Sequence, residues 1–132
     1  MGKAKQDKET ALYRFRHSLA HVLAQAVLET RPKAKLGFGP PIDTGFYYDF
    51  DFQGEPLAAS DLADLETRMR RIIKERQRFV RTDVPAADAI QRLEAAGQSY
   101  KVEYAPGTYR TTPMRCSRRC GFTSMTNTIC DQ

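Results

Sequence analysis

Apolar residues recur every three or four positions between Leu12 and Leu28, a spacing that predicts an amphipathic helix. Thr10 can cap the start of this helix, and Pro32 lies just beyond its end. The predicted apolar positions are Leu12, Phe15, Leu19, Val22, Leu23, Ala26 and Val27.

The pattern then changes to an alternation of aromatic and polar residues, with glycines and prolines before it. In residues 34–52 the aromatic residues Phe46, Tyr48, Phe50 and Phe52 occupy every second position. A period of two is typical of strands, and the preceding glycines and prolines favour a tight turn. We therefore predict a strand, a turn and a second strand.

Helical and extended patterns continue to alternate after residue 52. Ser60 is expected to cap a second helix, Phe79–Arg81 to be a short extended piece, and Pro85–Ala96 to form a third helix that ends before Gly97. Tyr100–Tyr104 is predicted to be a strand. The buried stripe of the second helix is predicted to be Leu62, Leu65, Met69, Ile72 and Ile73, and that of the third Ala89, Ile90 and Leu93. This order predicts an α+β fold with a largely antiparallel sheet and helices packed on one face.

Length and composition agree with one globular domain. The chain has 132 residues, 41% of them hydrophobic and 28% charged, which excludes an intrinsically disordered or collagen-like protein. No apolar run approaches the roughly 18 residues of a membrane span, and the Lys-rich start lacks the apolar stretch of a secretion signal. A cytoplasmic protein without a membrane partner is expected, with residues 1–10 disordered.

Residues 105–132 differ from the rest of the chain. They hold more than half of the net charge of +5, all three cysteines, and Ile129 as the only branched aliphatic residue. Such a composition cannot extend a core, so an irregular tail is predicted. Cys116, Cys120 and Cys130 offer a weak zinc alternative, because a CxxC pair and a fourth ligand are missing. No metal site is predicted.

The two histidines, His17 and His21, are four residues apart on the first predicted helix and should project from one face. They are either two partly exposed helix residues or parts of one site. A zinc-protease site is disfavoured because no glutamate lies between them. Tyr47 or Tyr48, whichever faces this helix, has a hydroxyl to offer a substrate.

The motifs RHSLAH, GPPIDTGFYYDF, MRRIIKE and SYKVE occur in this order between Arg16 and Glu103. Their combination resembles the editing domain of bacterial threonyl-tRNA synthetases over residues 11–104. Related alanyl-type domains share the HxxxH helix, but GFYYDF favours the threonyl family. The resemblance implies a threonyl/alanyl-type editing fold and an aminoacyl-tRNA ester hydrolase that removes serine from mischarged threonine tRNA.

The resemblance also implies roles for individual residues. His17 is expected to activate water or contact the ribose, and Lys101 to activate water or stabilise the oxyanion. Candidate substrate-binding residues are His21, Tyr47, Tyr48 and Asp49. The editing step is expected to need no cofactor. ATP and zinc serve the synthetic domain of a full-length relative, and the partners are mischarged threonine tRNA and the rest of that synthetase.

One part of the family's pattern is absent from this chain. The family completes its site with a Cys-x-x-x-His motif, whereas Cys116 and Cys120 have that spacing without a third histidine. A truncated synthetase whose tail is read out of frame would explain this, because residues 107–115 in a shifted frame can encode the acidic Asp-Leu-Pro stretch of the family. The alternatives are a catalytically inactive RNA-binding or pseudogene product and a free-standing hydrolase.

The second predicted helix has a run of basic residues that includes Arg70 and Lys74. A solvated surface is the simplest interpretation of this run. Arg70 and Lys74 are also candidates for weak electrostatic binding of the tRNA acceptor end.

Overall fold

The computed structural model describes residues 10–108, 114–119 and 128–129, with side chains described within 10–78 and 84–104. The predicted disorder of residues 1–10 therefore falls outside the described residues, except at Thr10. The elements are α1 (Ala11–Thr30), β1 (Lys35–Leu36), β2 (Pro41–Ile42), β3 (Gly45–Phe46), β4 (Phe50–Asp51), α2 (Asp61–Lys74), β5 (Phe79–Val84), α3 (Ala86–Ala95), α4 (Ser99–Thr108), β6 (Met114–Arg119) and β7 (Thr128–Ile129).

Helix α1 and its cap are confirmed. The Thr10 hydroxyl accepts a hydrogen bond from the Tyr13 backbone N–H at 3.1 Å, as an N-cap residue should. Burial is concentrated in the second half of the helix, from Ala20 to Val27. Leu12 and Phe15 are exposed, because the ribbon and α2 do not cover the first turns of α1.

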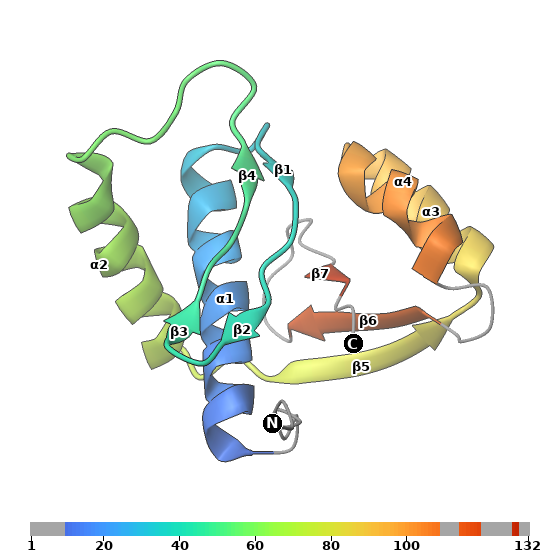
Figure 1. Ribbon diagram of the computed structural model, residues 1–132, viewed down its shortest axis with the longest axis horizontal. Coiled ribbons are helices and arrows are strands. Elements are labelled where there is room, and N and C mark those ends of the chain that lie inside the picture. The colour runs from blue at the N-terminus through green and yellow to red at the C-terminus, as the bar shows by residue number, and fades with distance from the viewer. Residues whose placement is uncertain (1–9, 109–113, 120–127, 130–132) are drawn as a thin grey trace, which may run out of the picture.

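The predicted strand, turn and strand form an antiparallel ribbon, residues 35–51, that crosses α1 (Figure 1). β1 pairs with β4 and β2 pairs with β3. Backbone bonds from Gly37 N–H to Asp49 O and from Asp49 N–H to Phe38 O, both 2.8 Å, link the two pairs. The predicted alternation is confirmed, since the rings of Tyr48 and Phe50 stack at 4.8 Å and those of Phe50 and Phe52 at 5.6 Å.

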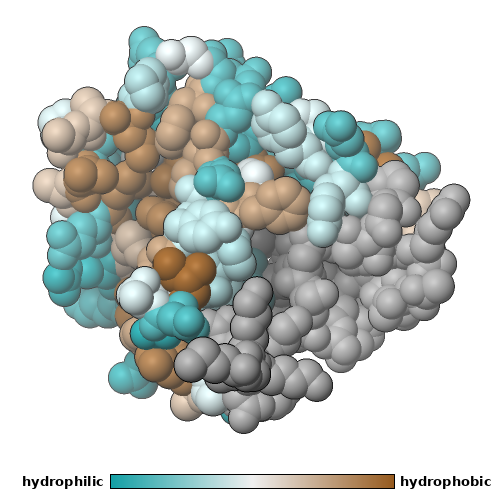
Figure 2. All heavy atoms as spheres, viewed as in Figure 1, coloured by the Kyte–Doolittle hydropathy of each residue, from teal (hydrophilic) through white to brown (hydrophobic). Residues whose placement is uncertain are grey.

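The main core lies between α1, α2 and the ribbon. Figure 2 shows apolar side chains gathered on the left of the molecule, over α2 and the ribbon. Phe50, Phe52, Leu57 and Met69 pack around the buried residues. The buried residues of this cluster are Val22, Ala26, Val27, Ala34, Leu65 and Ile72.

Two expectations for α2 are wrong. Leu62 and Ile73 are 59% and 51% exposed, because the stripe that α2 buries is narrower than predicted and contains only Leu65 and Ile72 as fully buried residues. Ser60 makes no side-chain cap bond. The Asp61 carboxylate accepts a bond from the Ala58 N–H at 3.0 Å, which closes the turn before α2, and its negative charge lies in the first turn of the helix.

The predicted third helix is confirmed as α3, and Gly97 takes the left-handed conformation (φ +70°) that ends it. The predicted strand Tyr100–Tyr104 is wrong, since these residues lie in α4. Val102 packs into the cluster of Val84, Ala89 and Leu93 on α3 and β5. A helix turns Val102 inward while Tyr100 and Tyr104, four residues apart, share another side.

Residues 105–132 are not irregular throughout, which corrects the prediction. α4 continues to Thr108, β6 pairs antiparallel with β5 along its whole length, and β7 pairs with β6. Backbone hydrogen bonds can build such a sheet without the apolar side chains on which the prediction relied. The α+β class and antiparallel pairing are confirmed, but the strands form three small sheets instead of one.

Candidate active site

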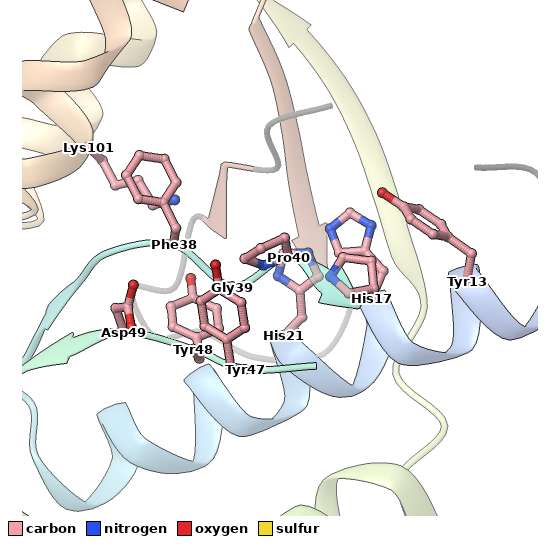
Figure 3. Close-up of a pocket in the computed structure, with 11 residues that line it drawn as sticks. Tyr13, His17, His21, Phe38, Gly39, Pro40, Tyr47, Tyr48, Asp49 and Lys101 are labelled. Carbon is pink, nitrogen blue, oxygen red and sulfur yellow. The ribbon is translucent and has the colours of Figure 1, made fainter. Parts of the chain in front are cut away.

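A cavity of about 290 Å³ lies between α1, the ribbon and α4 (Figure 3). It brings together every residue that was predicted to be catalytic or substrate-binding: His17, His21, Tyr47, Tyr48, Asp49 and Lys101. Its other lining residues are Tyr13, Phe38, Gly39, Pro40 and Pro41. These residues were selected from the sequence although they are far apart in the chain, and the fold places them around one cavity.

The two histidines lie on consecutive turns of α1, with ring centroids 4.9 Å apart and ring planes inclined by 32°. His21 is buried, with 8% of its surface exposed, whereas His17 is only partly buried. Burial lowers the pKa of His17 below its ordinary value of 6.5. The His17 imidazole is therefore neutral at neutral pH and able to accept a proton.

The aromatic wall of the cavity depends on a glycine. A Cβ at Gly39 would lie 2.1 Å from Cδ2 of Tyr48, which is far inside contact distance. The absence of a side chain lets the Tyr48 ring lie directly against the ribbon backbone. Pro40 and Pro41 fix the backbone that follows Gly39, so this side of the cavity is rigid.

Lys101 reaches the cavity from α4, at the end away from Tyr13 in Figure 3. Its Nζ atom lies 5.3 Å from the centre of the Phe38 ring, a cation–π distance. Two side chains of the same region hold α4 on the ribbon. Gln98 Oε1 accepts from the Leu36 N–H at 2.7 Å, and the Tyr100 hydroxyl donates to Asp51 at 2.7 Å.

We expect Gln98→Leu to lower the free energy of unfolding by about 1–3 kcal/mol, because the buried N–H of Leu36 loses its acceptor. Chemical denaturation measures this loss. Gln91→Leu, at an exposed position of α3, is the matched control and should change stability by no more than about 0.5 kcal/mol. Equal effects of the two substitutions would show that the Gln98 bond does not hold α4.

The predicted tRNA-binding residues Arg70 and Lys74 lie on α2, outside the cavity. Arg70 is paired with Glu66 on the exposed surface. Neighbouring arginines serve the fold, since Arg68 and Arg71 both pair with Glu29 of α1. The role of Arg70 and Lys74 in binding RNA stays a prediction.

Sequence reasoning did not select Tyr13, Phe38 or Gly39 as site residues. The sequence could have indicated Tyr13 as a neighbour of the histidines, because it precedes His17 by the same four residues that separate His17 from His21. The ring of Tyr13 lies edge-on to His17 with centroids 6.1 Å apart. Phe38 had no comparable signal, since its partners on α4 are distant in sequence.

Among the residues that the structure describes, no cluster of three or more His, Cys, Asp or Glu side chains could hold a metal ion. Cys120 and Cys130 fall outside this part of the chain, so the zinc alternative for the cysteines is not tested. Within the described ranges, no helix has the length and apolarity to cross a membrane.

A comparison with protein-family models found no match. The chain is, however, similar in sequence to curated threonine–tRNA ligases. The threonine–tRNA ligase of Thermobifida fusca is 55% identical over 97 residues, which are 74% of this chain and 14% of the relative. That of Mycobacterium avium is 57% identical over 89 residues, 67% of this chain and 13% of the relative. The chain thus spans about one seventh of the length of these relatives. The resemblance seen in the motifs is thereby confirmed: over most of its length, this chain is a homologue of one segment of the threonine–tRNA ligases.

Proposed function

We propose that this chain hydrolyses the ester bond of serine mischarged on threonine tRNA. The observation that carries the proposal is the meeting of His17, His21 and Lys101 in one small cavity, with His17 neutral. Homology to threonine–tRNA ligases supports tRNA as the partner. The proposed location is the cytoplasm, where bacterial tRNA is charged. Threonine–tRNA ligation, with its ATP and zinc, is proposed only for a full-length relative.

The reaction needs a base, an anion-stabilising group and a leaving group. His17 accepts a proton from water as the water oxygen attacks the ester carbonyl carbon. The Lys101 ammonium stabilises the resulting oxyanion. The bond between the carbonyl carbon and the ribose oxygen then breaks, and the proton on His17 passes to that oxygen. These steps use only side chains and water, so we propose no cofactor for them.

Selection of serine over threonine follows from the size and stiffness of the cavity. Serine lacks the methyl group of threonine, and the walls near the histidines are formed by prolines and aromatic rings. A rigid wall excludes an additional methyl group by steric contact, whereas a synthetic site discriminates poorly against the smaller amino acid. His21, Tyr47, Tyr48 and Asp49 are proposed to orient the amino acid and the terminal adenosine.

The direct test is release of serine from serine-charged threonine tRNA by the purified chain, with threonine-charged tRNA as the control substrate. We expect serine to be released above the buffer rate and threonine to stay bound. The absence of hydrolysis from a chain shown to be folded by circular dichroism would overturn the proposal. That result would favour an inactive RNA-binding or pseudogene product, for which the missing Cys-x-x-x-His motif is the supporting observation.

The proposal predicts a pH profile. His17 acts only when neutral, and burial lowers its pKa below 6.5. The rate of serine release should therefore rise with pH, reach its midpoint below pH 6.5 and be flat at neutral pH. Single-turnover rates in buffers of constant ionic strength provide the measurement. A midpoint above pH 6.5 would contradict the role of a buried neutral imidazole.

A further inference from the structure

Two exposed aromatic rings meet at the rim of the cavity. Phe38 of the ribbon and Tyr104 of α4 pack edge to face, with centroids 4.8 Å apart and planes at 80°. Phe38 is 41% exposed and Tyr104 is 43% exposed. Phe38 also lines the cavity, whereas Tyr104 lies outside the lining, so the pair extends the cavity wall onto the surface. Adjacent exposed rings beside a cavity are typical of binding surfaces.

The size of the cavity indicates what this surface would meet. At about 290 Å³, it is at the lower end of the roughly 300–1,000 Å³ range of ligand pockets. It has room for an amino acid and part of one nucleotide. When a tRNA end enters, the nucleotide before the terminal one must therefore lie on the rim. Unpaired bases bind proteins chiefly by stacking on aromatic side chains.

Two lysines, together with carboxylates, accompany the exposed rings. Lys101 Nζ lies over the Phe38 ring, and Lys35 Nζ lies 5.9 Å from the centre of the neighbouring Tyr100 ring. The Asp51 carboxylate also lies here and accepts a hydrogen bond from the Tyr100 hydroxyl at 2.7 Å. Aromatic rings beside lysines are a common arrangement in proteins that bind single-stranded nucleic acids, because phosphates attract cations and bases stack on flat apolar surfaces.

We propose that Phe38 and Tyr104 form a stacking platform for the unpaired base that precedes the terminal nucleotide of the tRNA. This inference rests on the proposed function, which brings the tRNA end into the cavity. The platform would tolerate any base, because stacking uses the flat face that every base has. Its contribution would be to hold the end of the strand while the terminal ester lies near His17.

The test measures binding of an uncharged single-stranded RNA that ends in CCA, followed by fluorescence anisotropy. A second RNA lacks only the base of the nucleotide before the terminal adenosine. Both are titrated with the 132-residue chain and with the variants Tyr104→Ala and Tyr104→Phe. Phe15→Ala removes a ring that is exposed but does not line the cavity, and it is the matched control.

For the unsubstituted chain, Tyr104→Phe and Phe15→Ala, we expect loss of the base to weaken binding about tenfold. For Tyr104→Ala, which binds the intact RNA more weakly, loss of the base should have little further effect. Equal affinity of the unsubstituted chain for both RNAs would overturn the platform, as would an equal effect of base loss on the unsubstituted chain and Tyr104→Ala.

This experiment separates the platform from the proposed hydrolysis, because uncharged RNA reports binding alone. A chain that releases serine but binds both RNAs equally would overturn the platform and leave the proposed function standing. A chain that shows the dependence on Tyr104 but releases no serine would support the platform and overturn hydrolysis.

Discussion

Replacing His17 by alanine should lower the rate of serine release by about 10²–10⁴-fold, the usual contribution of a positioned general base. His17 is the better candidate for the base because it is partly exposed and can be reached by water, while His21 is buried beside it. Burial keeps the His17 imidazole neutral by lowering its pKa. No other lining residue combines these properties among those described.

Single-turnover release of serine from charged tRNA measures this effect. Phe15→Ala is the control, because Phe15 lies on the same helix but does not line the cavity. The Phe15→Ala variant should release serine at the same rate as the unsubstituted chain. If His17→Ala releases serine within about threefold of that rate, a loss far below the range for a general base, the base must be another group. Binding of uncharged RNA by His17→Ala would show that a loss of rate is not a loss of substrate affinity.

Gly39→Ala should both destabilise the fold and deform the cavity. The new Cβ would lie 2.1, 2.4 and 2.8 Å from three carbons of the Tyr48 ring. This ring cannot move away freely, because it stacks on Phe50 at 4.8 Å. Overpacking of this kind typically costs about 1–3 kcal/mol of unfolding free energy. Serine release should also fall, since Tyr48 lines the cavity.

A double-mutant cycle identifies the cause of this loss. Unfolding free energies are measured by urea denaturation for the unsubstituted chain, Gly39→Ala, Tyr48→Ala and the double variant. Once the ring is absent, Gly39→Ala should cost almost nothing. The same cost with and without the Tyr48 ring would show that the glycine is required for another reason, such as backbone conformation.

Features that depend on neighbouring residues were predictable from the sequence. The Thr10 cap, helix α1 and the pairing of His17 with His21 follow from local spacing. The alternation of aromatic and polar residues up to Phe52 likewise predicted that Tyr48, Phe50 and Phe52 share one face of the ribbon. The resemblance added Lys101, whose position near the histidines no local pattern could indicate.

The errors arose where distant contacts decide the structure. Tyr100–Tyr104 alternates like a strand, but packing of Val102 against α3 and docking of Tyr100 on Asp51 favour a helix. The exposure of Leu62 and Ile73 depends on how much of α2 meets α1, which the sequence of α2 alone does not contain. The contact of Phe38 with Tyr104 is of the same kind, since more than sixty residues separate them.

The residues around the cavity belong to two separately packed regions of the fold. The histidines lie on the helix that shares its core with α2 and the ribbon, whereas Lys101 and Tyr104 lie on α4, which packs in the smaller cluster with α3 and β5. Gln98 and Tyr100 join these two regions. A fluctuation that breaks their bonds would therefore move Lys101 away from the cavity and Tyr104 away from its rim, while both histidines remain in place. Such a locally opened molecule would still look folded by the spectrum of its main core, yet it would have neither the cation for the oxyanion nor a complete surface for the RNA.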